Sequence, residues 1–412
     1  MRDISPIRTN ICSCVLILIN LAIFNNAQAE LEIRQNDAIE TVIQQYESVV
    51  KELEVTHGVY HPAISENLMQ LGLAYGSLDK YDQAHETFQQ ALHIHRVNYG
   101  LHSKEQLPIV EEIINANIKK NDWDTLNKNY DYLNWVYLRE YEHDVEDLIP
   151  LLERLANAKL YIVRNLDRSE QLKHLKDTEK LFNRIITLSE GKQGYLENKL
   201  NALHGVGLSN YLIASFLDGQ ESRDLRETAR DKQQAIRYYN AKIKSYINGK
   251  NAMLRIIREY ETNPDLSKES HVIALTHLGD WYLVFNKPLT AKATYQEAHQ
   301  LIASNNIKQN VIDYLFANPV QLPVYRSLYR SAPESEQQST ETNFIPVSLD
   351  VTRTGQTKNI QVIDSNTEKD KKLHRSIKKT LAATRFRPRF EQGKPVKTSD
   401  FNIKFPESGI PQ

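Results

Sequence analysis

The sequence contains almost no cysteine. Its 412 residues include two, Cys12 and Cys14, and both lie close to the N-terminus. The rest of the chain can form no disulfide bond, and it offers neither a cysteine nucleophile nor a cysteine-based zinc site. An oxidising compartment is therefore no hazard to this protein.

The common catalytic and nucleotide-binding signatures are also missing. The sequence has no G-x-S-x-G, no G-x-x-x-x-G-K-[ST], no G-x-G-x-x-G and no H-E-x-x-H. Glycine is scarce, with 14 in the chain, and helix-forming residues dominate. We therefore predict a largely helical protein that is not an enzyme, with no catalytic residues and no cofactor. The alternative is an enzyme whose site follows no known signature.

Histidines cluster in the first quarter of the chain. His57 and His61 are four residues apart, a spacing that could chelate a metal on one helix. Gly58 and Pro62 instead predict a loop followed by a helix start. His93 and His95 point to different sides of a helix. We therefore predict no metal site, and we interpret these histidines as exposed polar residues of helices.

Residues 1–29 have the pattern of a secretory signal peptide. Arg2 and Arg8 give a basic start, residues 11–24 form an apolar run, and residues 27–29 read Ala-Gln-Ala, a cleavage signal. A membrane span needs about 20 residues, so this run is short for one. We expect cleavage, export to the periplasm and no stable membrane span. The alternative is an uncleaved anchor in the inner membrane, with the rest of the chain facing the periplasm.

The remaining chain divides by charge. Residues 344–405 hold 14 Lys and Arg against six Asp and Glu, a net of +8, whereas residues 30–343 carry about −9. A basic module on an acidic body suggests two modules with different partners.

Two stretches in the acidic body share one spacing pattern. In residues 68–92 and 275–299, apolar residues lie on one face of each of two successive helices, and small residues allow those helices to approach closely. The matching positions in the two copies are Leu71, Gly72, Tyr75, Ala84, Phe88 and Ala91, then Leu278, Gly279, Tyr282, Ala291, Tyr295 and Ala298.

This pattern resembles the tetratricopeptide repeat. A degenerate middle copy follows the first at 42 residues, with Asn117 where Tyr is expected, and Leu203, Gly207 and Tyr211 predict a further first helix. Weak central copies are normal in a repeat array, because each repeat contacts only its neighbours. The resemblance implies an all-α helical solenoid over residues 30–329, whose inner surface binds proteins or peptides.

The composition and the hydrophobic pattern of the sequence change after residue 329. Residues 330–343 are polar and predict a flexible linker. Residues 344–406 then alternate in two strands, with a turn at Thr354-Gly355, followed by a helix from Lys369 to Ala383 and a last strand. The order β-β-α-β predicts a small α+β module, so the protein is multidomain.

This module resembles the C-terminal domain of the TonB family. The matching residues are Val351, Gly355, Val362, Ser365, Arg385-Phe386-Arg387-Pro388, Gly393-Lys394-Pro395-Val396, Ile403 and Phe405. The resemblance implies capture of an extended peptide by strand addition at the last strand. It also implies proteins or peptides of the cell envelope as partners, outer-membrane transporters among them.

The expected partner-binding residues follow from this resemblance and from the basic stretch before the last strand. They are Arg385, Arg387, Arg389, Thr398, Asp400, Phe401, Asn402, Ile403, Lys404 and Phe405. The chain departs from TonB proper, because its apolar start looks cleavable and a helical array replaces a Pro-rich spacer. We therefore predict a periplasmic adaptor, with a membrane-anchored energy transducer for outer-membrane transport as the alternative.

Two other interpretations of the basic stretch remain. Basic residues among aromatic ones can bind nucleic acid, but a signal peptide argues against that partner, and we predict none. The arginines could instead only keep a sheet edge soluble, because charged edges suppress unwanted strand pairing.

Overall fold

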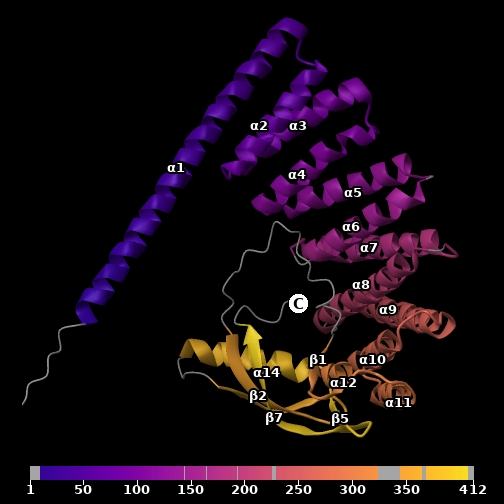
Figure 1. Ribbon diagram of the computed structural model, residues 1–412. Coiled ribbons are helices and arrows are strands. Elements are labelled where there is room, and N and C mark those ends of the chain that lie inside the picture. The colour runs from indigo at the N-terminus through magenta and orange to yellow at the C-terminus, as the bar shows by residue number, and fades with distance from the viewer. Residues whose placement is uncertain are drawn as a thin grey trace, which may run out of the picture. The chain divides into compact units, whose positions relative to one another are not determined.

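The computed structural model describes residues 10–142, 144–163, 165–192, 194–224, 229–322, 344–363 and 368–406 (Figure 1). The chain divides into two compact units, residues 1–143 and 144–412, and each is described by itself. The boundary falls inside the predicted helical domain, residues 30–329. The predicted linker, residues 330–343, lies outside the described residues, as does the start of the predicted signal peptide.

The first unit is helical. Its elements are α1 (Asn10–His57), α2 (Pro62–Ser77), α3 (Tyr81–Tyr99), a 3-10 turn η1 (Lys104–Gln106), α4 (Leu107–Lys120) and α5 (Trp123–Glu140). Pro62 occupies the first turn of α2, where its missing N–H costs no hydrogen bond, and His61 caps that helix by accepting from the backbone N–H of Ala63. Among the described residues, no helix has both the length and the apolarity needed to cross a bilayer.

Helices α2 and α3 form the hairpin that the first repeat copy predicts. Leu71, Ala84 and Ala91 are buried between its helices. A Cβ on Gly72 would lie only 2.4 Å from the ring of Phe88, so only glycine allows this approach. The small residues of the pattern therefore make room for its aromatic ring, and together they set how closely the two helices pack.

One turn recurs in three hairpins of the chain. Asp79, Asn121 and Asn286 have φ of 56°, 57° and 57°, in the left-handed region that Asp and Asn tolerate best. Each is followed by a residue whose N–H donates to the carbonyl five positions earlier, in the pairs Lys80–Tyr75, Asp122–Asn117 and Lys287–Tyr282. This geometry, found twice in the first unit and once in the second, is a common way for a helix to end, and it gives α2–α3, α4–α5 and α10–α11 the same turn between their helices.

The second unit begins with seven helices among its described residues. They are α6 (Val145–Ile162), α7 (Arg168–Ser189), α8 (Leu196–Asp224), α9 (Ala229–Thr262), α10 (Lys268–Val284), α11 (Pro288–Ser304) and α12 (Gln309–Phe316). Helices α8 and α9 pack against each other, as Leu203 and Gly207 predict, and Met253 of α9 covers Gly207. In α10–α11, a Cβ on Gly279 would lie 2.4 Å from the ring of Tyr295, which matches the first copy. Tyr282 is only half-buried, as is Tyr75.

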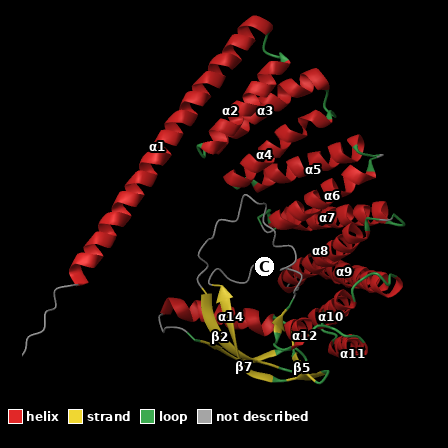
Figure 2. Ribbon diagram, viewed as in Figure 1, coloured by secondary structure: helices red, strands yellow, loops and turns green. Residues whose placement is uncertain are grey.

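A small α+β module follows these helices. It contains β2 (Phe344–Val351), β3 (Thr357–Val362), α14 (Glu368–Ala383), β4 (Phe386–Arg387), β5 (Arg389–Glu391), β6 (Lys394–Val396) and β7 (Thr398–Pro406). The strands β3, β2 and β7 form an antiparallel sheet in that order. One face of this sheet packs on α14 (Figure 2), where Ile377 and Leu381 join Val347, Phe386 and Phe405 in the core.

The module differs from the predicted β-β-α-β order in one region. The basic stretch forms the short strand β4 and the hairpin β5–β6 before the last strand. Strand β4 pairs with β1 (Val320–Gln321), which follows α12 and belongs to the predicted helical domain. The pattern could not predict this, because two-residue strands carry no measurable alternation.

Candidate functional site

The basic stretch has one fully buried arginine. Arg387 is 2% exposed, and its guanidinium lies against Asp280 of α10. Nε donates to Oδ1 at 2.8 Å and Nη2 donates to Oδ2 at 2.9 Å, while Nη1 donates to the carbonyl of Leu315 at 2.7 Å. Tyr295 adds a hydrogen bond from its hydroxyl to Oδ1 of Asp280 at 2.7 Å. Each nitrogen of the guanidinium and each oxygen of the carboxylate therefore has a protein partner.

The electrostatics of this pair favour the charged guanidinium. Burial alone lowers the pKa of Arg387, but the charge of Asp280 and its hydrogen bonds outweigh burial and hold that pKa above its usual value. The same environment disfavours the protonated form of the neighbouring His277. Burial, and next the charge of Arg387, lower the pKa of His277 to about 3, so this imidazole is neutral.

Aromatic rings extend the contact between the module and the helices. The ring of Phe390 lies 5.2 Å from that of Tyr295 and 5.0 Å from that of Phe316, measured between centroids. His299 completes the cluster at 5.1 Å from Phe390. Such edge and tilted pairs stabilise beyond the area they bury. The basic stretch is thus an internal joint that fixes the module on α10, α11 and α12.

This placement corrects the expectation for Arg387. Its guanidinium is enclosed by Asp280 and Leu315, so it is not on a surface that a partner can reach. Arg385 and Arg389 are half-buried: Arg385 Nη2 donates to Asn286 Oδ1 at 3.5 Å, and Arg389 Nη1 lies 2.8 Å from Glu391 Oε1. Of the three arginines of the basic stretch, the central one is directed at the helices.

The other predicted partner-binding residues line β7. This strand pairs with β2 on one side, and no described strand pairs with its other side. Phe401, Ile403 and Phe405 turn towards the core, whereas Asp400, Asn402 and Lys404 are exposed, and Thr398 is half-buried. The backbone edge that strand addition requires is therefore present at the predicted residues. Partner binding there remains a prediction.

Asp350 fixes the start of β7. Its carboxylate lies 2.8 Å from Nζ of Lys397, accepts from Asn359 Nδ2 at 2.9 Å and accepts from the backbone N–H of Asp400 at 3.2 Å. The hydrogen bond from Lys397, then that from Asp400, lower the pKa of Asp350. Asp400 itself has φ of 53°, and the pairing of β2 with β7 shifts register between Leu349 and Val351. The edge strand thus begins at an irregularity that one carboxylate holds in place.

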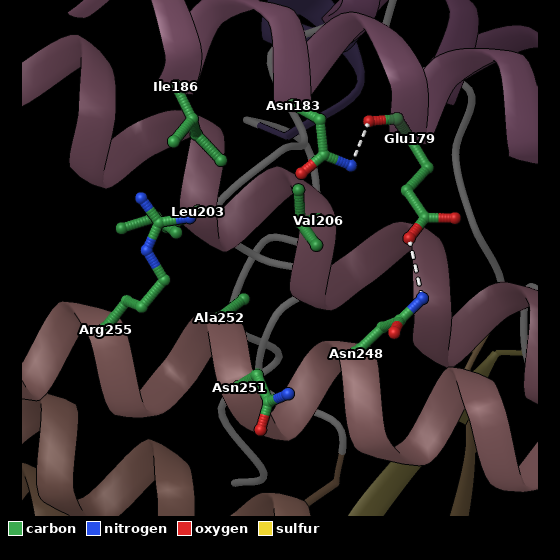
Figure 3. Close-up of a pocket in the computed structure, with 9 residues that line it drawn as sticks. All are labelled: Glu179, Asn183, Ile186, Leu203, Val206, Asn248, Asn251, Ala252 and Arg255. Atoms are coloured by element: carbon green, nitrogen blue, oxygen red, sulfur yellow. Dashed lines mark hydrogen bonds between the residues drawn. The ribbon is translucent and has the colours of Figure 1, made fainter. Parts of the chain in front are cut away.

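The second unit also contains a polar pocket of about 250 Å³ between α7, α8 and α9 (Figure 3). Its apolar lining is Ile186, Leu203, Val206 and Ala252, and its polar lining is Glu179, Asn183, Asn248, Asn251 and Arg255. The pocket therefore combines an apolar floor with three amide side chains and two charged groups.

An ion-pair cluster borders this pocket. Arg255 Nη2 donates to Glu190 Oε2 at 3.0 Å, and Lys199 lies 3.0 Å from Glu190 and 2.7 Å from Glu259. The hydrogen bond from Lys199 is the largest cause of the lowered pKa of Glu190. The charge of Arg255 is thus compensated at the pocket wall.

This pocket was not predicted from the sequence. Its polar residues belong to no known signature, but their spacing carries a signal. Glu179 and Asn183 are four residues apart on α7, and Asn251 and Arg255 are four apart on α9, so each pair lies on one helix face. What the spacing could not show is that these two faces meet.

The early histidines adopt the predicted loop and helix start. His57 ends α1 and His61 precedes α2, and their rings stack at 4.8 Å between centroids. Among the described residues, no group of three or more His, Cys, Asp and Glu side chains could hold a metal ion.

Comparison with known proteins shows only distant similarity. No family model matches the chain, and no curated protein matches it. One similar solved structure is a putative kinesin light chain with nearly identical TPR-like repeats from Podosopora anserina, with a TM-score of 0.34 and 15% identity over 53% of this chain and 93% of that chain. A single-substitution variant of that protein has a TM-score of 0.33 and 14% identity over 53% of this chain and 95% of that chain. The repeat architecture therefore rests on the hairpin geometry of this chain itself.

Proposed function

We propose that this protein is a non-enzymatic adaptor of the periplasm that joins two polypeptide partners. The helical array binds one partner, and an extended segment of the other adds as a strand to β7. Both activities are protein binding, the role to which helical repeat arrays are suited because they expose a long, continuous surface.

The observation that carries this proposal is the position of β7. It is a nine-residue edge strand with one described strand partner. The opposite edge, β3, is shorter and partly covered: Thr357 Oγ1 donates to the carbonyl of Leu381 in α14 at 2.8 Å, and Gln356 bridges to Arg385. An added strand therefore fits β7 better than β3. The resemblance to the TonB family, carried by Arg385-Phe386-Arg387-Pro388 and the Gly393-Lys394-Pro395 turn, supports the same edge.

Site-specific photo-crosslinking in cells tests the edge. A photo-reactive amino acid replaces Asn402 on β7, and in a matched variant it replaces Gln361, which is exposed on β3. We expect one discrete crosslinked partner at residue 402 and none at residue 361. Equal crosslinking at both positions, or none at residue 402, would contradict strand addition.

The alternative is a membrane-anchored energy transducer, in which the apolar N-terminal segment is not cleaved. N-terminal sequencing with cell fractionation separates the two cases. A start at Glu30 in the soluble periplasmic fraction supports the adaptor, and an intact Met1 in the inner-membrane fraction supports the energy transducer.

A further inference from the structure

The pocket between α7, α8 and α9 has an acidic group that lacks a counter-charge. The carboxylate of Glu179 is half-buried, and its Oε1 accepts from Asn210 Nδ2 at 2.9 Å and from Asn248 Nδ2 at 3.2 Å. Within the described part of the chain, no Lys, Arg or His side chain pairs with Glu179. Two amide donors hold this carboxylate in place without neutralising it.

The amides next to Glu179 leave their oxygens free to accept. Asn183 Nδ2 donates to the backbone carbonyl of Glu179 at 3.0 Å, and Asn248 Nδ2 donates to its carboxylate. Both partners are acceptors only, so the amide nitrogens must face them and the amide oxygens must face away. This side of the pocket therefore has a surplus of acceptors, which a ligand rich in N–H donors would satisfy.

Arg255, the one basic residue of the pocket lining, does not donate to these acceptors. Figure 3 shows Arg255 on the opposite side of the pocket from Glu179, and its guanidinium donates to Glu190 at 3.0 Å. Between these two sides, the buried side chains of Leu203 and Val206 form an apolar floor. Such a floor suits the aliphatic stem of a long basic side chain, whose charged end then reaches the acceptors.

We propose that this pocket binds the guanidinium or ammonium group of one Arg or Lys side chain from a polypeptide partner. The inference rests on the proposed function, in which the helical array holds a polypeptide, and it adds the chemistry of the residue that is recognised. Charge-assisted hydrogen bonds to Glu179, with further ones to the oxygens of Asn183 and Asn248, provide the selectivity.

A fluorescein-labelled peptide, Ser-Gly-Ser-Arg-Ser-Gly-Ser, tests this site by fluorescence anisotropy with the full chain. In Glu179→Gln, the oxygen can still accept from Asn210 and Asn248, so the fold is kept while the charge is lost. We expect binding to weaken by at least about tenfold, because the hydrogen bonds between the ligand and residue 179 lose the assistance of the carboxylate charge. The matched control, Glu170→Gln, removes an exposed carboxylate from the first turn of α7 and should bind within about twofold of the original protein.

Peptide variants sharpen the test. Replacing the arginine by citrulline, which has the same shape and no charge, should also weaken binding by at least about tenfold. Absence of binding by the arginine peptide, equal binding of the citrulline peptide, or unchanged binding by Glu179→Gln would overturn the proposal. Competition by agmatine as effective as the unlabelled peptide would assign the pocket to a free small cation and overturn the polypeptide ligand. Crosslinking at residue 402 is independent of Glu179, so failure here leaves strand addition to be judged on its own result.

Discussion

The hairpins α2–α3 and α10–α11 have the same design and different uses. In each, a glycine of the first helix packs against an aromatic ring of the second. A Cβ atom added to either glycine would lie 2.4 Å from that ring. The residue after the glycine is where they diverge: Leu73 is 38% exposed, whereas Asp280 is 0% exposed. A solvent-facing position of one repeat has become, in the other, the anchor for Arg387 of the C-terminal module.

The aromatic ring that packs against the glycine also differs between the two hairpins. Phe88 only packs, whereas the hydroxyl of Tyr295 donates to Asp280. The two hairpins therefore share the residues that pack their helices together, and they differ at the position that faces away from this packing. In the second hairpin that position is Asp280, which binds Arg387 of the C-terminal module while the glycine–ring packing stays the same.

The largest expected effect follows from breaking the buried ion pair. Arg387→Met leaves Asp280 uncompensated inside the protein, and loss of one partner of such a pair costs about 3–5 kcal/mol of unfolding free energy. Arg385→Met, which removes a half-buried arginine two residues away, should cost less than about 1 kcal/mol. Guanidinium denaturation of both variants measures the difference. Similar costs for the two would mean that Arg387 has no special role.

Acid should destabilise the second unit through two histidines, the half-buried His204 of α8 and the buried His277 of α10. Burial, and then the charge of His277, lower the pKa of His204 to about 3, and the pKa of His277 is about 3 as well. Their unfolded pKa is near 6.5, so below that pH the unfolded state binds more protons and stability falls as the pH falls towards 3. At pH 5, each histidine costs about 2 kcal/mol relative to neutral pH.

Tryptophan fluorescence locates this acid effect. The chain has three tryptophans, and a Trp123→Phe/Trp135→Phe variant keeps only Trp281, in α10. The guanidinium midpoint of this variant should fall clearly between pH 7 and pH 5. An unchanged midpoint would show that the two histidines are not neutral inside the folded protein.

The glycines of the two hairpins should respond alike. Gly72→Ala and Gly279→Ala each drive a methyl group into a ring, and overpacking of this kind costs about 1–3 kcal/mol. Gly76→Ala, in the same helix as Gly72, meets no atom within 4 Å and should stabilise by up to about 1 kcal/mol. Thermal denaturation of the three variants checks this, and a cost at only one hairpin would break the equivalence.

The smallest effect tests the added hydroxyl. Tyr295→Phe makes the second hairpin match the first and removes one hydrogen bond to Asp280, at an expected cost of about 1–2 kcal/mol. In Arg387→Met this substitution should cost a different amount, because both groups bond the same carboxylate. Equal costs in the two backgrounds would show that the hydroxyl and the guanidinium act independently.

Local patterns predicted much of this fold. The offsets around Gly72 and Gly279 located both hairpins, and the alternation of apolar and polar residues after residue 344 located the first strand of the sheet. The expected edge at residues 398–405 coincides with β7. The helices and strands themselves follow from residues that are close in sequence, so periodicity is sufficient to find them, whereas the pairing of β7 with β2 joins residues about 50 or more positions apart.

The parts that sequence could not predict depend on distant contacts. Arg387 lies 107 positions after Asp280, and an alternating arginine looks the same whether it faces water or a buried carboxylate. The pocket around Glu179 likewise forms because three helices meet there. Its residues read as ordinary polar positions of separate helices until their packing brings them together.

A double-mutant cycle between Asp280 and Arg387 tests the central claim most directly. The claim is that this pair fixes the C-terminal module on the α10–α11 hairpin. The unfolding free energies of Asp280→Leu, Arg387→Met and the double variant give their coupling energy. We predict a coupling of at least about 2 kcal/mol, with the double variant more stable than either single one. If the costs of the two single substitutions add up to that of the double variant within about 0.5 kcal/mol, the pair does not fix the module on the hairpin. Arg387 would then again be a candidate partner-binding residue.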